Sequence, residues 1–164
     1  MKKHTIDNNK FKGLVAEICK QISADNWRPD YIVGISRGGL LPAVMISHYF
    51  NIPMKPLQVS LRDGGDCVSD LGMAEDAFDG KNILIVDDIN DQGTTLNWIM
   101  KDWPSGCLPY DERWEHIWGS NVRFAVVVDN LSSQCAIGMH YWGMEVNKAE
   151  DNVWIDFPYE EWWK

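Results

Sequence analysis

Apolar residues recur at helical spacing in three stretches of the chain, residues 11–22, 38–50 and 94–103. Asp7 or Asn8 is the expected cap of the first helix, and the proline in "NWRPD" is expected to end it. The second begins at a pair of glycines and tolerates Pro42 only within its first turn. Pro104 is expected to stop the third helix.

Apolar segments separate these helices and predict strands at residues 31–36, 55–62, 81–88 and 122–130. The run "ILIV" in the third of them is typical of a strand buried on both faces of a parallel sheet. Strands that alternate with helices indicate an α/β fold with a central, mostly parallel sheet flanked by helices.

The remaining segments carry weaker patterns. Residues 63–80 are rich in Gly and Asp and predict a long loop, with short hairpin strands as an alternative. After Ser132 the apolar pieces become short and rich in Trp. With 164 residues, the chain is expected to form a single domain, 1–164, with a core at about 10–130 and a C-terminal hood at about 131–164.

The charge balance limits the classes of partner. The chain has 15 Lys and Arg against 24 Asp and Glu, a formal charge of −9, which argues against a nucleic-acid binder. A phosphate substrate would therefore have to be held by local cations, backbone N–H groups or a metal ion.

Cysteine usage and hydropathy favour a cytoplasmic protein. Four cysteines are scattered without a CxxC pair or zinc spacing, so reduced thiols are expected. The two N-terminal lysines are not followed by the apolar segment of a signal peptide, and no apolar run has the length of a membrane span. No membrane partner is expected.

The stretch "ILIVDDINDQGTTL" places acids and an anion-binding turn at the end of a buried strand. Asp87 and Asp88 can accept hydrogen bonds from a vicinal diol or ligate Mg²⁺. The turn "DQGTT" offers backbone N–H groups at a helix N-terminus, with the hydroxyls of Thr94 and Thr95, and favours a phosphate. The two sites are about a ribose 5-phosphate apart. The simple alternative, that these residues only cap a helix, requires one of them rather than five.

The stretch "GISRGG" predicts a second anion site after the first strand. Two glycines let the backbone approach a ligand closely, Arg37 offers a planar fork of donors, and Ser36 adds a hydroxyl, which together form a cradle for a diphosphate.

The residues of these two loops also fit other classes of protein. Residues 34–38 match the G-x-S-x-G turn of serine hydrolases, with Ser36 as nucleophile and Asp87 and then His116 or His140 completing a triad. Receiver domains pair two acids at a strand end, but normally near the chain start. No P-loop motif is present.

Together the two loops identify a family. "ILIVDDINDQGTTL" resembles the phosphoribosyl-diphosphate (PRPP) signature of type I phosphoribosyltransferases, and "PDYIVGISRGGLLPAVMISHYFNIP" resembles their diphosphate loop and first core helix, with xanthine–guanine and related purine enzymes as the closest group. "VWIDFPYEEWW" resembles their closing segment. The resemblance implies the type I phosphoribosyltransferase fold, with a small hood from the C-terminal segment and the N-terminal segment as a second candidate contributor.

The resemblance also implies roles for individual residues. Asp91 would act as a general acid or base near N7 of a purine, and a lid would span roughly residues 61–75. The ribose hydroxyls and Mg²⁺ would be held by Asp87 and Asp88. The 5-phosphate would be gripped by Gln92, Gly93, Thr94 and Thr95. The diphosphate would lie on Ser36, Arg37 and Gly38, in a loop that often contains an unusual cis peptide. The base would meet Trp154 and the backbone of Ile155.

The implied reaction joins PRPP to a free base and gives a nucleoside 5-monophosphate and diphosphate, a reaction of purine salvage. One departure leaves the base open: the 6-oxopurine enzymes carry a lysine just after the fourth core strand, where this chain has Asp129 and Asn130. An Asn130 amide can donate to a carbonyl or accept from an amine. Preference for guanine, xanthine or hypoxanthine is therefore open, and adenine, another base or a substrate outside salvage remain options.

Two further matters stay open at this stage. A PRPP-binding regulatory protein of the same fold, without turnover, is the alternative to an enzyme; Asp91 and the lid favour the enzyme. A homodimer or homotetramer is expected.

Overall fold

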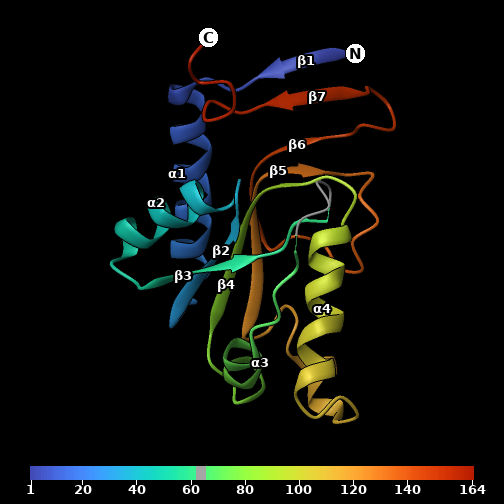
Figure 1. Ribbon diagram of the computed structural model, residues 1–164. Coiled ribbons are helices and arrows are strands. Elements are labelled where there is room, and N and C mark those ends of the chain that lie inside the picture. Colours follow the sequence, from blue (N-terminus) through green and yellow to red (C-terminus); the bar gives the residue numbers. More distant parts are fainter. Residues whose placement is uncertain (62–65) are drawn as a thin grey trace.

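The computed structural model describes residues 1–61 and 66–164, and a parallel sheet of five strands forms its centre (Figure 1). The strand order is β3 (Met54–Gln58), β2 (Tyr31–Ser36), β4 (Ile83–Asn90), β5 (Val122–Asn130) and β6 (Tyr141–Val146), and all neighbours run parallel. The α/β fold with a central parallel sheet is confirmed. Because the strands are parallel, their carboxyl ends share one edge of the sheet.

Helices cover both faces of this sheet. α1 (Asn8–Ala24) and α2 (Leu40–Phe50) pack on one face, and α3 (Leu71–Phe78) and α4 (Thr94–Gly106) pack on the other. The apolar run of β4 serves both sides, since Ile83 and Ile85 contact the cluster of α3 and α4 while Leu84 and Val86 contact that of α1 and α2. This explains why the run shows no polar alternation.

The helix boundaries follow local chemistry. The Asp7 carboxylate caps α1 by accepting from the Lys10 N–H at 2.7 Å, and Pro42 lies in the first turn of α2, as predicted. The predicted stop at Pro104 is wrong, since α4 continues to Gly106. The proline lies in the last turn, where its missing N–H removes only one helical hydrogen bond.

The predicted loop at residues 63–80 is wrong over its second half, where α3 forms. The Asp70 carboxylate caps this helix by accepting from the Met73 N–H at 2.9 Å. Met73, Ala77 and Phe78 are buried against the sheet at helical spacing. The range expected for the lid, residues 61–75, therefore includes the start of α3, and its residues 62–65 lie outside the described part of the chain.

Both ends of the chain form the hood. β1 (Lys2–Thr5) pairs in parallel with β7 (Val153–Asp156), and the two strands lie side by side above the carboxyl edge of the sheet (Figure 1). The hood is smaller than the predicted range 131–164, because β6 joins the main sheet. The Gln21 side chain holds β6 beneath α1 by bonding both the N–H and the carbonyl of Trp142.

Two tryptophans complete the core on the side of α3 and α4. Trp103 and Trp114, the latter in the short 3₁₀ helix η1 (Glu112–His116), are buried in the core. The four cysteines are free thiols. Within residues 1–61 and 66–164, no helix combines the length and the apolar character that crossing a membrane requires.

The fold generates a prediction about acid stability at His140. Burial, followed by the positive charge of Arg123, lowers the pKa of His140, and its Nδ1 accepts the Phe124 N–H at 2.8 Å. The unfolded chain therefore binds this proton at higher pH than the folded chain, so unfolding free energy should fall as pH drops below about 6.5. One proton limits this contribution to about 1.4 kcal/mol per pH unit.

Urea titrations between pH 7.5 and 5 measure this effect. His140→Gln should have a shallower dependence of unfolding free energy on pH than the parent chain. His48→Gln, at an exposed position on α2, is the matched control and should keep the parent slope. Equal slopes for the parent and His140→Gln would contradict the assignment.

Candidate active site

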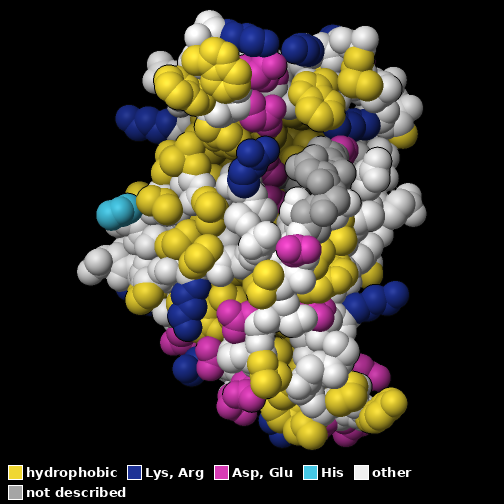
Figure 2. Space-filling view, viewed as in Figure 1, with side chains coloured by type: hydrophobic (Ala, Val, Ile, Leu, Met, Phe, Trp, Pro, Cys, Tyr) yellow, Lys and Arg dark blue, Asp and Glu magenta, His cyan; other side chains and the backbone are white. Residues whose placement is uncertain are grey.

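A cleft of about 980 Å³ opens at the carboxyl edge of the sheet and is lined by both predicted loops. The loops after β2 and β4 meet there with the segment after β3 and with the chain after β7. Figure 2 shows a hollow in the upper part of this face with acidic and basic side chains beside it. The lining residues with predicted roles are Ser36, Arg37, Gly38, Asp87, Asp88, Asp91, Gln92, Gly93, Thr94 and Thr95.

Two glycines let the loop after β2 lie directly on β4. A Cβ on Gly38 would stand 2.0 Å from Asp88 Oδ2, and a Cβ on Gly39 would stand 2.4 Å from the Val86 carbonyl oxygen. No side chain fits at either position. The peptide bond between Ser36 and Arg37 is cis, as the resemblance implied.

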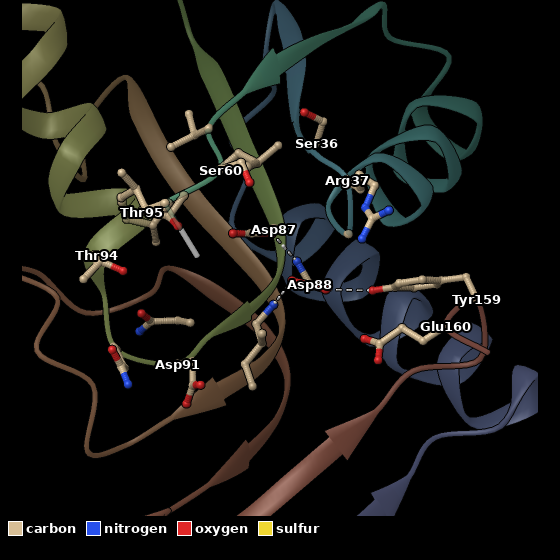
Figure 3. A pocket seen from close by; sticks show the side chains of 18 of the residues that line it. Ser36, Arg37, Ser60, Asp87, Asp88, Asp91, Thr94, Thr95, Tyr159 and Glu160 are labelled. Carbon is tan, nitrogen blue, oxygen red and sulfur yellow. Dashed lines mark hydrogen bonds between the residues drawn. The ribbon is translucent and has the colours of Figure 1, made fainter. Parts of the chain in front are cut away.

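The acidic pair is held by its own backbone and by a tyrosine. Asp87 Oδ1 accepts the Asp88 N–H at 2.9 Å, and Asp88 Oδ1 accepts the Ile89 N–H at 2.8 Å. Asp88 Oδ2 accepts the hydroxyl of Tyr159 at 2.9 Å (Figure 3). Burial, and then the negative charge of Asp88, raise the pKa of Tyr159 far above its usual value, so the phenol stays protonated and acts as the donor.

The turn before α4 offers an anion site. Gly93 is the N-cap of α4, with a positive φ of 84°. No side chain makes a capping hydrogen bond there, so Asp91, Thr94 and Thr95 are not helix caps. A Cβ on Gly93 would also stand 2.3 Å from the backbone nitrogen of Cys135. The first turn of the helix lines the cleft, where its N–H groups and dipole favour an anion.

Asp91 is paired with a lysine that sequence reasoning missed. Lys148 Nζ lies 2.9 Å from Asp91 Oδ1, and both side chains are only 15% exposed. Lys148 follows β6 by two residues, nearly sixty positions after Asp91 in the chain. No motif spacing connects the two, and the order β4, β5, β6 in the parallel sheet brings the ends of β4 and β6 to the same edge.

The proposed base contact of Asn130 is wrong. Asn130 is 4% exposed and lines neither the cleft nor the smaller cavity beside Trp154. Its amide nitrogen donates to the Asp91 carbonyl at 2.8 Å, and its oxygen accepts from Ser132 and from the Lys148 N–H at 3.0 Å. These contacts point the side chain toward the backbone around it and away from the cleft.

A smaller cavity of about 80 Å³ adjoins the cleft beneath the hood. Trp154 and Ile155 of β7 form one side of it, and Asp91 and Lys148 form another. Trp154 is 41% exposed, whereas the Ile155 side chain is buried in the core. Thus Trp154 can stack on a planar ligand, and Ile155 can present only its backbone.

Charge around the cleft is mostly negative. Burial, and then the charges of Asp88 and Asp156, raise the pKa of Glu160, and Arg37 opposes this effect. In Figure 3, Arg37 and Glu160 lie on the same side of Asp87 and Asp88, one on either side of Tyr159. A divalent cation would relieve the repulsion among these carboxylates.

A serine-hydrolase triad is not assembled. Ser36 ends β2 at the carboxyl edge of the sheet, whereas His140 accepts the N–H of Phe124 near the start of β5, at the opposite edge. His116 ends the 3₁₀ helix that precedes β5, also at that opposite edge. Neither histidine lines the described cleft.

Tyr159, Glu160 and Lys148 line the two cavities without having been predicted. Trp154 and Ile155 were predicted to meet the base because the segment "VWIDFPYEEWW" resembles the closing segment of the family. A tyrosine and a glutamate that face inward a few residues later have no periodic signal, since residues 157–164 form turns rather than a helix or strand.

Comparison with known proteins agrees with this geometry. The family model of the phosphoribosyl transferase domain matches residues 5–162. Xanthine-guanine phosphoribosyltransferase of Idiomarina loihiensis is 33% identical over 145 residues, which cover 86% of this chain and 76% of that protein. Xanthine phosphoribosyltransferase 1 of Saccharomyces cerevisiae is 31% identical over 121 residues, and the match spans 59% of this chain and only 58% of the yeast protein.

The fold has solved counterparts as well. The crystal structure of purine phosphoribosyltransferase from Pyrococcus horikoshii superposes with a TM-score of 0.68 at 23% identity, covering 98% of this chain and 95% of that one. Since the family model spans almost the whole chain and both signature loops line one cleft, this chain belongs to the phosphoribosyltransferase family and has its type I fold.

Proposed function

We propose that this protein transfers the phosphoribosyl group of PRPP to a ring nitrogen of a purine base and releases diphosphate. The observation that carries the proposal is the convergence of the loops after β2 and β4 on one cleft of about 980 Å³. Relatives named as xanthine-guanine phosphoribosyltransferases support a purine as the acceptor.

The substrate would lie across the strand ends. Asp87 and Asp88 accept the ribose hydroxyls, and the turn at residues 92–95 holds the 5-phosphate at the N-terminus of α4. Arg37 and Ser36 meet the diphosphate from the opposite wall of the cleft (Figure 3). Trp154 and the Ile155 backbone would receive the base in the adjoining cavity.

The chemistry is a substitution at C1 of the ribose. The bond from C1 to the diphosphate oxygen breaks with its electron pair, and the base nitrogen forms the new bond to C1. Positive charge develops on the sugar in between, and the carboxylates of Asp87 and Asp88 lie where they stabilise it. Asp91 would exchange the proton of the base near N7.

Mg²⁺ fits the donor set as a substrate-bound ion. Among the described residues, no cluster of three or more His, Cys, Asp or Glu is arranged to hold a metal by itself. Asp87 and Asp88 supply hard carboxylate oxygens, and Mg²⁺ in such sites takes its other ligands from phosphates and water. When bound, the ion neutralises the leaving diphosphate. This resolves how a chain of charge −9 holds an anionic substrate.

Turnover itself is the first test, because a regulatory PRPP-binding protein would have the same cleft. Diphosphate release is measured with PRPP, Mg²⁺ and a panel of guanine, xanthine, hypoxanthine and adenine. Release with at least one base is expected. PRPP binding without release on any base would favour the regulator.

Neutralising Asp87 and Asp88 should change the affinity for PRPP in the direction opposite to that expected from charge alone. Asp87→Asn with Asp88→Asn removes two negative charges near an anionic ligand, so electrostatics alone would tighten PRPP binding. If these carboxylates hold the diol and Mg²⁺, affinity should instead fall by about 100-fold or more, since each hydrogen bond to a charged group contributes about 1.5–3 kcal/mol.

Calorimetric titration of PRPP with and without Mg²⁺ measures this change. Asp79→Asn with Glu115→Gln makes the same charge change at exposed positions and should leave the affinity nearly unaltered. Unchanged or tighter PRPP binding by the Asp87 and Asp88 variant would remove the diol assignment.

If Asp91 transfers a proton, its substitution should lower kcat much more than the affinity for PRPP. Asp91→Asn keeps the size of the side chain but removes its capacity to accept a proton. We expect kcat to fall by about 10²- to 10⁴-fold while the Kd of PRPP changes by less than about threefold. Stopped-flow and equilibrium titrations give the two values, and an equal loss of both would deny Asp91 a part in proton transfer.

A further inference from the structure

We propose that Lys148, delivered from the connection between β6 and β7, selects bases that present a ring carbonyl next to Asp91, and that Asn130 is its positioning residue. This inference rests on the proposed function and narrows its substrate class to 6-oxopurines. It also accounts for the lysine missing after β5, since a different strand supplies the cation.

Asn130 fixes the place of Lys148 relative to the loop after β4. Its amide nitrogen donates to the Asp91 carbonyl at 2.8 Å, and its oxygen accepts the Lys148 backbone N–H at 3.0 Å. The Leu131 N–H also donates to the Val146 carbonyl at 2.8 Å. The backbones that carry Asp91 and Lys148 are therefore tied together through one buried side chain.

The Lys148 ammonium lies at the smaller cavity with an acid and an aromatic ring beside it. Its Nζ is 2.9 Å from Asp91 Oδ1 and 5.9 Å from the centre of the Trp154 ring. The side chain is 15% exposed, and it lines the cavity with both of these partners. A planar base that stacks on Trp154 would thus bring one edge to the ammonium and to Asp91.

The ammonium is a donor that cannot accept. It has three N–H groups, one of which serves Asp91, and the others are available to an oxygen on the base. An exocyclic amino group offers only hydrogens and leaves a buried donor unsatisfied. A site built around such a donor rejects the analogue that cannot accept from it. Hypoxanthine should therefore be strongly preferred to adenine, which carries an amine at the same carbon.

Lys148 has a simpler possible role, which is to neutralise Asp91. In that case its removal would weaken the use of every purine to the same extent. The ratio between two bases that differ only at the sixth ring position separates the two roles, because neutralisation of Asp91 does not depend on that substituent.

The experiment compares the parent chain with Lys148→Met, Lys148→Gln and Lys148→Arg. The ratio of kcat/KM for hypoxanthine over adenine is measured at saturating PRPP and Mg²⁺, and Trp fluorescence gives the Kd values of inosine and adenosine 5-monophosphates without turnover. Lys148→Met should reduce both ratios by about 10- to 100-fold, with the Kd of PRPP changed by less than about threefold. Lys148→Arg should keep most of the preference.

Matched controls protect the interpretation. Lys81, which pairs with Asp76 at 3.3 Å away from the cleft, is changed to Met and should keep the parent ratios. Asn130→Ala should also lower both ratios, because Lys148 loses the contact that positions it. Its loss of preference should be in the same direction as that of Lys148→Met. If Lys148→Met fails to fold, Lys148→Gln takes its place. The Gln amide can both donate and accept, so this variant should also lose the preference for hypoxanthine over adenine.

The outcomes distinguish the two proposals. An unchanged ratio in folded Lys148 variants, or a parent chain that prefers adenine, overturns the role of Lys148 and leaves phosphoribosyl transfer standing. If the parent chain turns over no base and still binds inosine over adenosine monophosphate through Lys148, transfer is overturned and the base selection stands.

Discussion

The site depends on one close contact, the backbone of Gly38 lying directly on the carboxylate of Asp88. A single added methyl group would come within 2.0 Å of that carboxylate, and Gly39 is confined equally by the carbonyl of Val86. These contacts draw the loop after β2 onto the end of β4, so that a guanidinium and an acidic pair from separate strands face one cleft. The parallel sheet brings the two strand ends to the same edge, and the absence of two side chains brings them within reach of one small ligand.

The hood extends this contact to the ends of the chain. β1 and β7 pair with each other above the sheet, and the turn that follows β7 returns Tyr159 to Asp88. The acid at the centre of the cleft is therefore bonded to the segment that carries the base-stacking candidate Trp154. The ring of Tyr159 also stacks on Phe157, with centroids 5.5 Å apart, so the turn is held both by the core and by the acid of the cleft.

The sequence predicted the parts of the site that repeat a local pattern. The strands at Tyr31–Ser36 and Val122–Asn130 have the predicted bounds, because continuous apolar runs end there in polar turns. The acids and the glycine turn after β4 lie together because they are neighbours in the chain. Prediction failed where tertiary contacts decide: α3 forms from a Gly- and Asp-rich segment because Met73 and Phe78 meet the sheet, and β6 joins the main sheet because β5 offers it an edge. Lys148 was missed for the same reason, since its partner Asp91 is distant in the chain.

Asn130 occupies the position expected for a base-reading residue, but its side chain does not have that role. It stands where a base-reading lysine was expected, and an amide there suggested a changed specificity. Its side chain instead joins three backbone segments, and a cation from the next strand occupies the space beside Asp91. A ligand responds to charge and donors at a point in space, whichever strand provides them. An acidic pair, an anion-binding turn and a donor beside an aromatic ring thus meet in one cleft although the residue at the end of β5 is not a cation, because adjacent parallel strands end at the same edge of the sheet.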